Sequence, residues 1–263
     1  MTNATRTITA AAILALALLI SSAASAAIMP ASYDFGSDPG KDTIADAGLT
    51  TYIQDTRTGE MSVSDVADGI SLHDLLDGSK GREKMGFYRT FDGLGPDDSD
   101  DFVITTTFTQ PNANWNSPRI GIHLFGDTGS SNYWQNGICA SVMKNGDMYI
   151  YGSGVESGLL VSGSIDKTVS NFETTIEVVG TYGTYGTDNL QLALTVSADG
   201  ASSTITTTVD TTGFVATQTG FGVSSSQDDT NEYIVDTFSV TPEPATMGLL
   251  AMGGLAVLKR RRR

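Results

Sequence analysis

The central part of the chain alternates between apolar and polar residues with a period of two, the pattern of β-strands that bury one face. In the stretch 172–179, for example, Ile176 and Val178 alternate with polar residues. Turn sequences such as Lys144-Asn-Gly-Asp147 and Ala198-Asp-Gly200 supply the positive φ angles that hairpins need. The pattern predicts an all-β, two-sheet antiparallel sandwich. The clearest strands are expected at 102–108, 120–125, 172–179, 190–196, 204–209 and 234–240.

One segment, Ser71 to Lys80, suggests a helix instead. Leu72, Leu75 and Leu76 would share one helical face before Gly78 ends the run. The rest of the region 45–95 matches no element that its pattern assigns.

The N-terminus has the three parts of a secretory signal peptide. Arg6 supplies the positive charge, residues 10–20 are apolar, and Ala24 and Ala26 form an A-x-A cleavage site. We expect residues 1–26 to be removed, with an uncleaved membrane anchor as the alternative.

The C-terminus combines two prolines, an apolar run and five consecutive cations. Pro242 and Pro244 prevent a regular helix and favour an extended, accessible hinge. As a helix the thirteen residues 246–258 would span about 20 Å, less than the roughly 30 Å of a bilayer core. The cations 259–263 would stay on the cytoplasmic side. The tail is therefore expected to engage the membrane, with the preceding chain outside.

Residues 241–263 resemble a PEP-CTERM sorting signal, because Pro242-Glu243-Pro244, the apolar segment and the basic end occur in that order. The resemblance implies recognition by an exosortase, removal of the tail and delivery to the cell surface or extracellular matrix. An ordinary C-terminal membrane anchor is the alternative.

Charge limits the possible partners of the exported part. Removing both signals takes away six of 15 cations and at most one of 30 anions, which leaves a net charge of −20 or −21. Such a protein repels nucleic acid, so DNA or RNA binding is not expected, whereas divalent cations are attracted. Cys139 is the only cysteine, which excludes an intramolecular disulfide.

From Asp101 to Val240 the order of strands and turns resembles concanavalin A-like jelly rolls of the laminin-G type. The segments that carry the resemblance are "DFVITTTFT", "PRIGIHLFGD", "GDMYIYG", "NFETTIEVVG", "LQLALTVSADG", "GFGVSSS" and "YIVDTFSV". The resemblance implies one jelly-roll domain over residues 27–240. It also implies that "YDFGSDPG", residues 33–40, is the first strand and lies beside the last.

No catalytic residues are predicted. A retaining glycosidase needs two carboxylates about 5–5.5 Å apart, and the Glu-x-Asp-x-x-Glu string of laminarinase-like jelly rolls is absent. Glu173 and Glu177 share one face but are expected to be solvated. Arg119 and His123 partly match the Gln-Ile-His strand of alginate lyases, although Gly121 replaces the glutamine. We expect His123 to face away from Ile122 as a structural or exposed histidine, with a catalytic role as the alternative.

Residues suited to sugar binding are easier to find in the sequence than catalytic residues. Trp115, Tyr133 and Trp134 lie in Asn-rich loops with Asn114 and Asn132. Aromatic faces stack on the C–H surface of a sugar ring while amides bind its hydroxyls. The alternative is that these aromatic residues close the ends of the sandwich.

Calcium is the metal expected if any binds, because carboxylates are plentiful and the setting is extracellular. Asp236 is in phase with Phe238 and Val240, so it is predicted to point inward, where a carboxylate needs a cation or several N–H donors. Asp34 or Asp38 of the first strand would join Asp236 at a structural calcium site, and the alternative is that Asp236 only caps a turn.

Together these features predict an exported surface or matrix protein that interacts with polysaccharide without catalysis. Two alternatives stay open: a glycan hydrolase or lyase of the jelly-roll class, and a purely structural surface protein.

Overall fold

The computed structural model describes most of the region between the two terminal signals. The described residues are 31–36, 40–54, 61–74, 83–91, 101–113, 119–125, 137–153, 158–166, 173–182, 189–211, 217–225 and 231–242.

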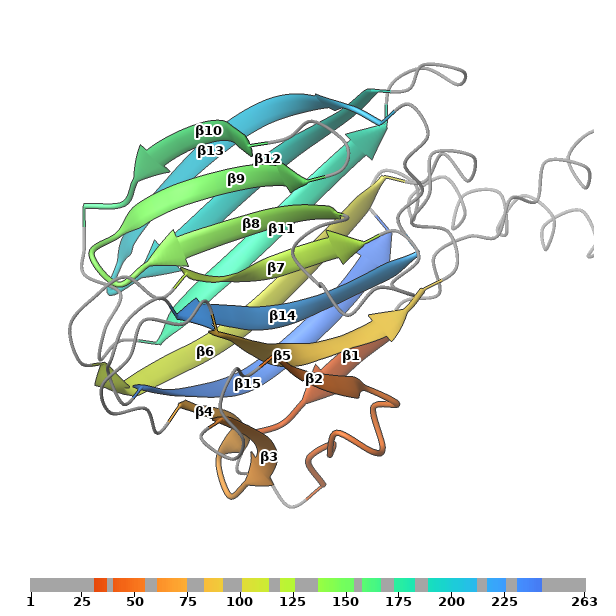
Figure 1. Ribbon diagram of the computed structural model, residues 1–263, viewed down its shortest axis with the longest axis vertical. Helices are drawn as coiled ribbons and strands as arrows, with labels where there is room; N and C mark the ends of the chain where they lie inside the picture. Colours follow the sequence, from red (N-terminus) through yellow and green to blue (C-terminus); the bar gives the residue numbers. More distant parts are fainter. Residues whose placement is uncertain are drawn as a thin grey trace, which may run out of the picture.

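These residues form two antiparallel β-sheets that pack face to face (Figure 1). The back sheet has eight strands, with β1 (Ala31–Asp34) beside β15 and the others in the order β13-β12-β11-β6-β15-β4-β3. Their bounds are β13 Ala201–Asp210, β12 Asn189–Ala198, β11 Thr174–Tyr182, β6 Phe102–Ala113, β15 Asn231–Pro242, β4 Gly69–Asp74 and β3 Met61–Val66.

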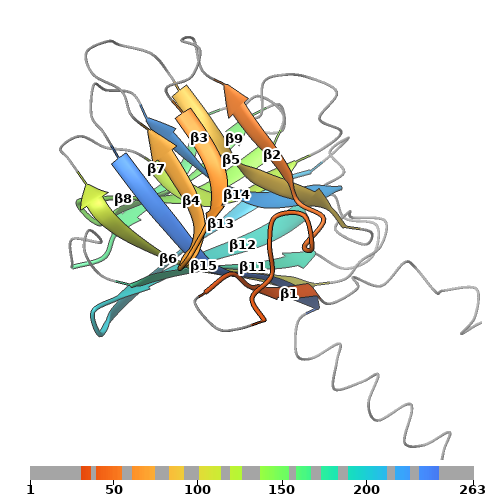
Figure 2. The ribbon, with the colours of Figure 1, turned by 90° about the horizontal axis from the view of Figure 1, so that it is seen from below.

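The front sheet has seven strands in the order β10-β9-β8-β7-β14-β5-β2. Their bounds are β10 Gly158–Ser164, β9 Asp147–Ser153, β8 Gly137–Met143, β7 Arg119–Phe125, β14 Gln218–Ser225, β5 Glu83–Thr90 and β2 Thr50–Gln54. Strands β2 and β3, which end the two sheets on the same side, lie close together (Figure 2). This arrangement confirms the predicted all-β sandwich.

The sequence alternation directly produces the core. In β11 every second residue is buried, beginning at Thr174 and ending at Tyr182. The two sheets meet through aromatic rings: Phe87 contacts Phe238 with ring centroids 5.5 Å apart, and Phe108 contacts Phe221 at 5.4 Å. Each fully buried phenylalanine contributes about 1.5–3 kcal/mol relative to an exposed one, so these contacts hold the sheets together.

The expected pairing of the first and last strands is confirmed, although the first strand spans Ala31–Asp34 and not residues 33–40. Tyr33 of β1 lies opposite Phe238 of β15, and Asp34 lies opposite Thr237. Hairpin turns also occur where the sequence predicts them: Asp199 and Gly200, between β12 and β13, have φ angles of 47° and 75°.

The predicted helix at 71–80 is wrong for the part that the structure describes, since β4 is a strand through Asp74. Leu75 and Leu76 lie outside the described residues. Strand β4 is paired on both sides, with β3 and β15, and Leu72 is fully buried opposite Tyr233. Pairing on both edges favours the extended conformation over a weak helical pattern.

Candidate functional site

The outward side of the front sheet carries an unusual set of side chains. Strand β7 buries Ile120, Ile122 and Leu124 between the sheets, so Gly121 and His123 face outward. The prediction that His123 points away from these apolar residues is confirmed.

Strand register places the neighbours of Gly121 and His123. We call the following two rows of residues the tyrosine face. One row contains Tyr149, Ser141, Gly121, Gly222, Gly86 and Tyr52, and the next contains Tyr151, Cys139, His123, Gly220, Tyr88 and Thr50. Small residues therefore occupy most of the centre of this face, and tyrosines lie on both sides.

The tyrosines form two pairs. On β9 the rings of Tyr149 and Tyr151 lie 5.6 Å apart at 34°. On β2 and β5 the rings of Tyr52 and Tyr88 lie 6.4 Å apart at 45°. All four side chains are half-buried. Each pair thus presents a partly exposed aromatic side-chain surface, as sugar-binding sites do, although the Tyr52 hydroxyl oxygen itself is buried.

Glycine in the centre lets Tyr52 lie across the sheet. A Cβ atom at Gly222 would be 2.1 Å from the Tyr52 hydroxyl oxygen, and one at Gly86 would be 2.8 Å from it. Any larger residue at either position would displace this hydroxyl.

His123 is buried, with Nε2 4.0 Å from Sγ of the buried Cys139. Burial lowers the pKa of His123 to about 3, helped by the positive charge of Lys84 and opposed by a hydrogen bond with the Gly222 backbone. The imidazole is therefore neutral at physiological pH. A pKa this low makes His123 a poor general base at neutral pH.

Two of the carboxylates expected to bind calcium, Asp34 and Asp236, lie on strands of the back sheet, and Asp236 does not take the fully buried inward position predicted for it. Asp236 is the extra residue of a β-bulge between Val235 and Thr237. The bulge changes the phase of the strand, so Val235 and Phe238 take the core positions while Asp236 is half-buried. Burial raises the pKa of Asp236 to about 6, with further contributions from the carboxylates of Glu173, Asp34 and Asp68.

A calcium site is not complete among the described residues. Asp34 uses Oδ1 to accept a hydrogen bond from the Gly36 amide at 2.9 Å, which caps a local turn. Across the described ranges, no three His, Cys, Asp or Glu side chains are grouped so that they could hold a metal ion. Asp38 lies outside these ranges.

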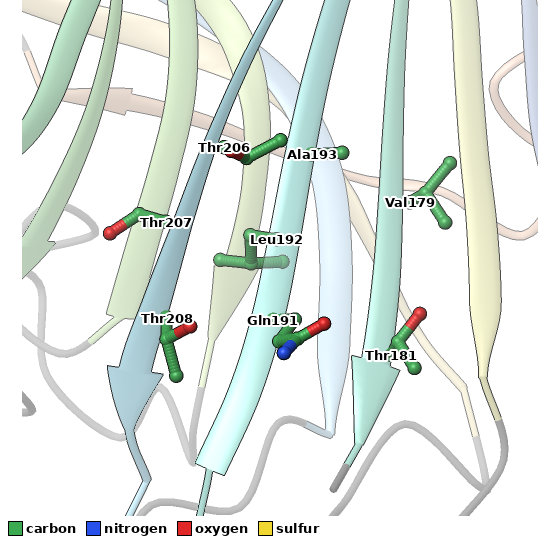
Figure 3. Close-up of a pocket in the computed structure, with 8 residues that line it drawn as sticks. All are labelled: Val179, Thr181, Gln191, Leu192, Ala193, Thr206, Thr207 and Thr208. Carbon is green, nitrogen blue, oxygen red and sulfur yellow. The ribbon is translucent and has the colours of Figure 1, made fainter.

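The outer side of the back sheet has a shallow hollow of about 410 Å³. Val179, Ala193 and Thr206 form one row along it, and Thr181, Gln191 and Thr208 form the next (Figure 3). The small side chain of Ala193 leaves the space, and hydroxyl and amide groups border it.

Most residues that the sequence predicts for sugar binding and processing lie outside the described residues. The residues outside the described ranges are Trp115, Tyr133, Trp134, Asn114, Asn132, Ala24, Ala26, Glu243 and Pro244. Pro242 of the sorting motif is described, and it ends β15 opposite Phe102. The two loops that contain the aromatic residues connect to opposite ends of β7.

Sequence reasoning missed the four tyrosines of the tyrosine face. Tyr149 and Tyr151 carry a local signal, since residues two apart on a strand share a face. Tyr52 and Tyr88 carry none, because only the pairing of β2 with β5 brings them together.

Comparison with solved structures defines the class of fold. The chain is similar to a seed lectin from Lotus tetragonolobus, with 12% identity over 81% of this chain and 98% of the lectin and a TM-score of 0.50. It is also similar to a marine PL-14 alginate lyase from Aplysia kurodai, with 13% identity, the same coverage of both chains and a TM-score of 0.51. The fold is therefore the lectin-type, concanavalin A-like jelly roll, which these two proteins use for different activities.

Sequence comparison identifies the C-terminus more specifically. Residues 240–263 match the PEP-CTERM protein-sorting motif, as the resemblance implied. The motif indicates an exported protein that is sorted to the cell surface. No curated protein matches the chain. The described residues include no helix that is long and apolar enough to cross a membrane.

Proposed function

We propose that this chain is a surface or matrix protein that binds polysaccharide, without catalysis, on the tyrosine face. The observation that carries the proposal is the pair of tyrosines on each side of a centre built largely of glycine, serine and cysteine. A sugar chain laid across the strands would stack on the partly exposed tyrosine side chains at both sides. The loops with Trp115 and Trp134 would extend this surface at the ends of β7.

The composition of the tyrosine face favours binding over cleavage. Its two rows contain no Asp or Glu, so they offer no pair of carboxylates for glycoside hydrolysis. Its histidine has a pKa of about 3, far from the value that suits a general base at neutral pH. The rival function is a hydrolase or lyase that uses other residues.

The proposal also includes the removal of both terminal signals. Residues 1–26 act as a signal peptide, residues 27–240 form the exported domain, and residues 241–263 are recognised by an exosortase. The tail contacts the membrane until it is removed, and the exported domain then joins the extracellular polysaccharide.

Affinity electrophoresis tests the proposal directly. The full chain is run through gels that contain different polysaccharides, with calcium or with a chelator, and each gel is afterwards stained for intact polymer. We expect slower migration in at least one gel without loss of polymer. A cleared zone would instead establish an enzyme, and unchanged migration in every gel would favour a purely structural protein.

Matched variants locate the binding surface. Replacing Tyr149 and Tyr151 together by alanine should abolish the slower migration, whereas replacing both by phenylalanine should keep most of it, because the rings remain. Thr107→Ala, on the outer side of the back sheet, is the control. Equal binding by the alanine and phenylalanine variants would remove the tyrosine face from the proposal.

A further inference from the structure

The last strand of the back sheet overlaps with the sorting motif. The PEP-CTERM match begins at Val240, whereas β15 continues to Pro242 beside β6 (Figure 1). Val240, Thr241 and Pro242 lie opposite Ile104, Val103 and Phe102 of β6. The first three residues of the matched segment therefore belong to the folded sheet.

Val240 holds this end of β15 in the sheet. Its side chain is fully buried in the core. On the side away from β6, β1 also pairs with β15 and places Ala31 opposite Val240. Separating residues 240–242 from the sheet would expose the valine side chain to water. Exposure of one buried valine lowers the population of such an open state by roughly 10- to 100-fold.

The partner strand of Pro242 is fixed at the same place. Phe102 packs so closely on β11 that a Cβ atom at Gly180 would lie 2.1 Å from its Cζ atom. The rings of Phe102 and Tyr182 also contact each other, with centroids 6.2 Å apart. Next to it, Oδ1 of Asp101 accepts a hydrogen bond from the Tyr182 amide at 3.0 Å. The beginning of β6 therefore cannot move away from Pro242 without breaking these contacts.

Pro242 suits the last position of a strand. Proline has no N–H to donate to a ladder, so it is found at strand ends rather than inside sheets. It also restricts the preceding residue, Thr241, to the extended conformation that a strand requires. The first proline of the motif thus marks the end of the sheet.

We infer that the folded sheet limits tail removal: the sorting enzyme cuts the folded chain beyond Pro242, and Val240, Thr241 and Pro242 stay in the mature protein. A peptide bound in an extended conformation needs free backbone groups for hydrogen bonds with its partner. Residues paired within a sheet already use such groups. Recognition of residues 241–263 does not require that all of them are removed.

The cut breaks one peptide bond. Water, or an amine in its place, adds to the carbonyl carbon of the retained residue, and the nitrogen of the released tail takes the proton. The inference rests on the exosortase processing proposed above and adds the position of the cut relative to the fold.

Both signals are attached at one end of the sandwich. Strand β1 begins at Ala31, shortly after the expected signal cleavage at Ala26, and it lies beside the end of β15 (Figure 2). The chain therefore enters and leaves the folded domain at the same place. An enzyme in the membrane would meet this end of the domain, where Val240 is already held in the sheet.

Intact mass spectrometry of the mature protein tests the inference. The full chain is expressed in a bacterium that makes an exosortase, and the protein is recovered from the cell surface. We expect a mature chain that ends at Pro242 or later. An end at Thr241 or earlier would overturn the inference alone. A tail that is never removed would overturn the proposed processing and this inference with it.

Digestion of the purified full chain with an unspecific protease tests whether the sheet sets this limit. Trimming from the C-terminus should slow sharply at or beyond Pro242. Val240→Ala removes two buried carbon atoms, so trimming should pass Pro242 about tenfold faster. Thr241→Ala changes the next, outward-facing residue and should behave as the wild type does. Equal rates in all three proteins would contradict the inference. If Val240→Ala does not fold, the wild type decides, because trimming that continues into β15 without slowing also contradicts it.

Discussion

The imidazole Nε2 of His123 lies 4.0 Å from Sγ of Cys139, and both side chains are buried on the outward side of the front sheet. Cys139 does not belong to the apolar core between the sheets. A titratable group is thus enclosed on a face that would otherwise be solvated. Its protonation must affect folding, since a buried cation without a compensating charge is strongly unfavourable.

Protonation of His123 should make the protein less stable in acid. The folded pKa of about 3 lies below the ordinary value of 6.5, so between these values the unfolded chain binds more protons. The free energy of unfolding should therefore fall as pH decreases from 6.5, by about 1.4 kcal/mol per pH unit from this group. Urea denaturation at a series of pH values measures this slope.

His123→Gln provides the comparison for that slope. Glutamine cannot be protonated, so the variant should be less stable at pH 7 but should lose less stability between pH 6.5 and 4. Equal slopes for variant and wild type would show that the buried imidazole does not cause the acid sensitivity. NMR adds a direct check, because the His123 ring signals should not titrate between pH 8 and 5.

Asp236 should change stability with pH in the opposite direction to His123. Its folded pKa of about 6 lies above the ordinary value of 3.8, so the folded state holds the proton more tightly. Its contribution to stability is present at low pH and is lost as pH rises through 6. Asp236→Asn should therefore raise the melting temperature at pH 7.5, where the buried charge is removed, and should change it little at pH 4.

The gain in stability from Asp236→Asn should be modest because Asp236 is only half-buried. We expect a gain on the order of 1 kcal/mol at pH 7.5. Glu177→Gln removes a negative charge from the same sheet and is the control. A gain from Asp236→Asn that is the same at both pH values would contradict the assigned pKa.

Calcium binding can be tested with the wild type and the Asp236→Asn variant. If Asp34, Asp38 and Asp236 hold a calcium ion, calcium should raise the melting temperature of the wild type at pH 7.5 but not that of Asp236→Asn. Identical wild-type melting temperatures with calcium and with a chelator would rule out this site.

Strands with a clear alternation could be predicted from sequence, because one buried face leaves a direct trace in the residue order. The pairing of the first strand with the last followed from the resemblance to jelly rolls, whereas the register of Tyr33 opposite Phe238 did not. The region 45–95 could not be assigned, since its strands are short and their stability comes from partners distant in sequence. Leu72 illustrates this: its burial depends on Tyr233, 161 residues further along the chain.

The tyrosine face was less predictable for a related reason. It requires the register of six strands, and a shift of one residue in any strand would turn its side chains to the other side. The bulge at Asp236 could not be predicted either. Its extra residue changes which face a carboxylate occupies without leaving a pattern in the sequence.

The glycines of the tyrosine face offer the sharpest test of its geometry. At Gly220 a Cβ atom would lie 2.0 Å from the carbonyl oxygen of Phe87, whereas at Gly222 it would lie 2.1 Å from the Tyr52 hydroxyl oxygen and 2.9 Å from the carbonyl oxygen of Met85. A side chain can rotate away, but a neighbouring strand cannot move without losing its pairing. Gly220→Ala should therefore destabilise the protein by about 2–3 kcal/mol or more, and Gly222→Ala by less.

Adding Tyr52→Ala separates the two cases by a double-mutant cycle. Removing the tyrosine ring should recover part of the stability lost in Gly222→Ala and none of that lost in Gly220→Ala, as measured by urea denaturation. The residual cost at Gly222 should reflect the carbonyl oxygen of Met85, which stays in place. Equal recovery in both backgrounds would mean that Tyr52 does not lie over Gly222 in solution. In that case the side of the tyrosine face next to β2 would be more open than the structure places it, and Gly222→Ala should leave polysaccharide binding unchanged.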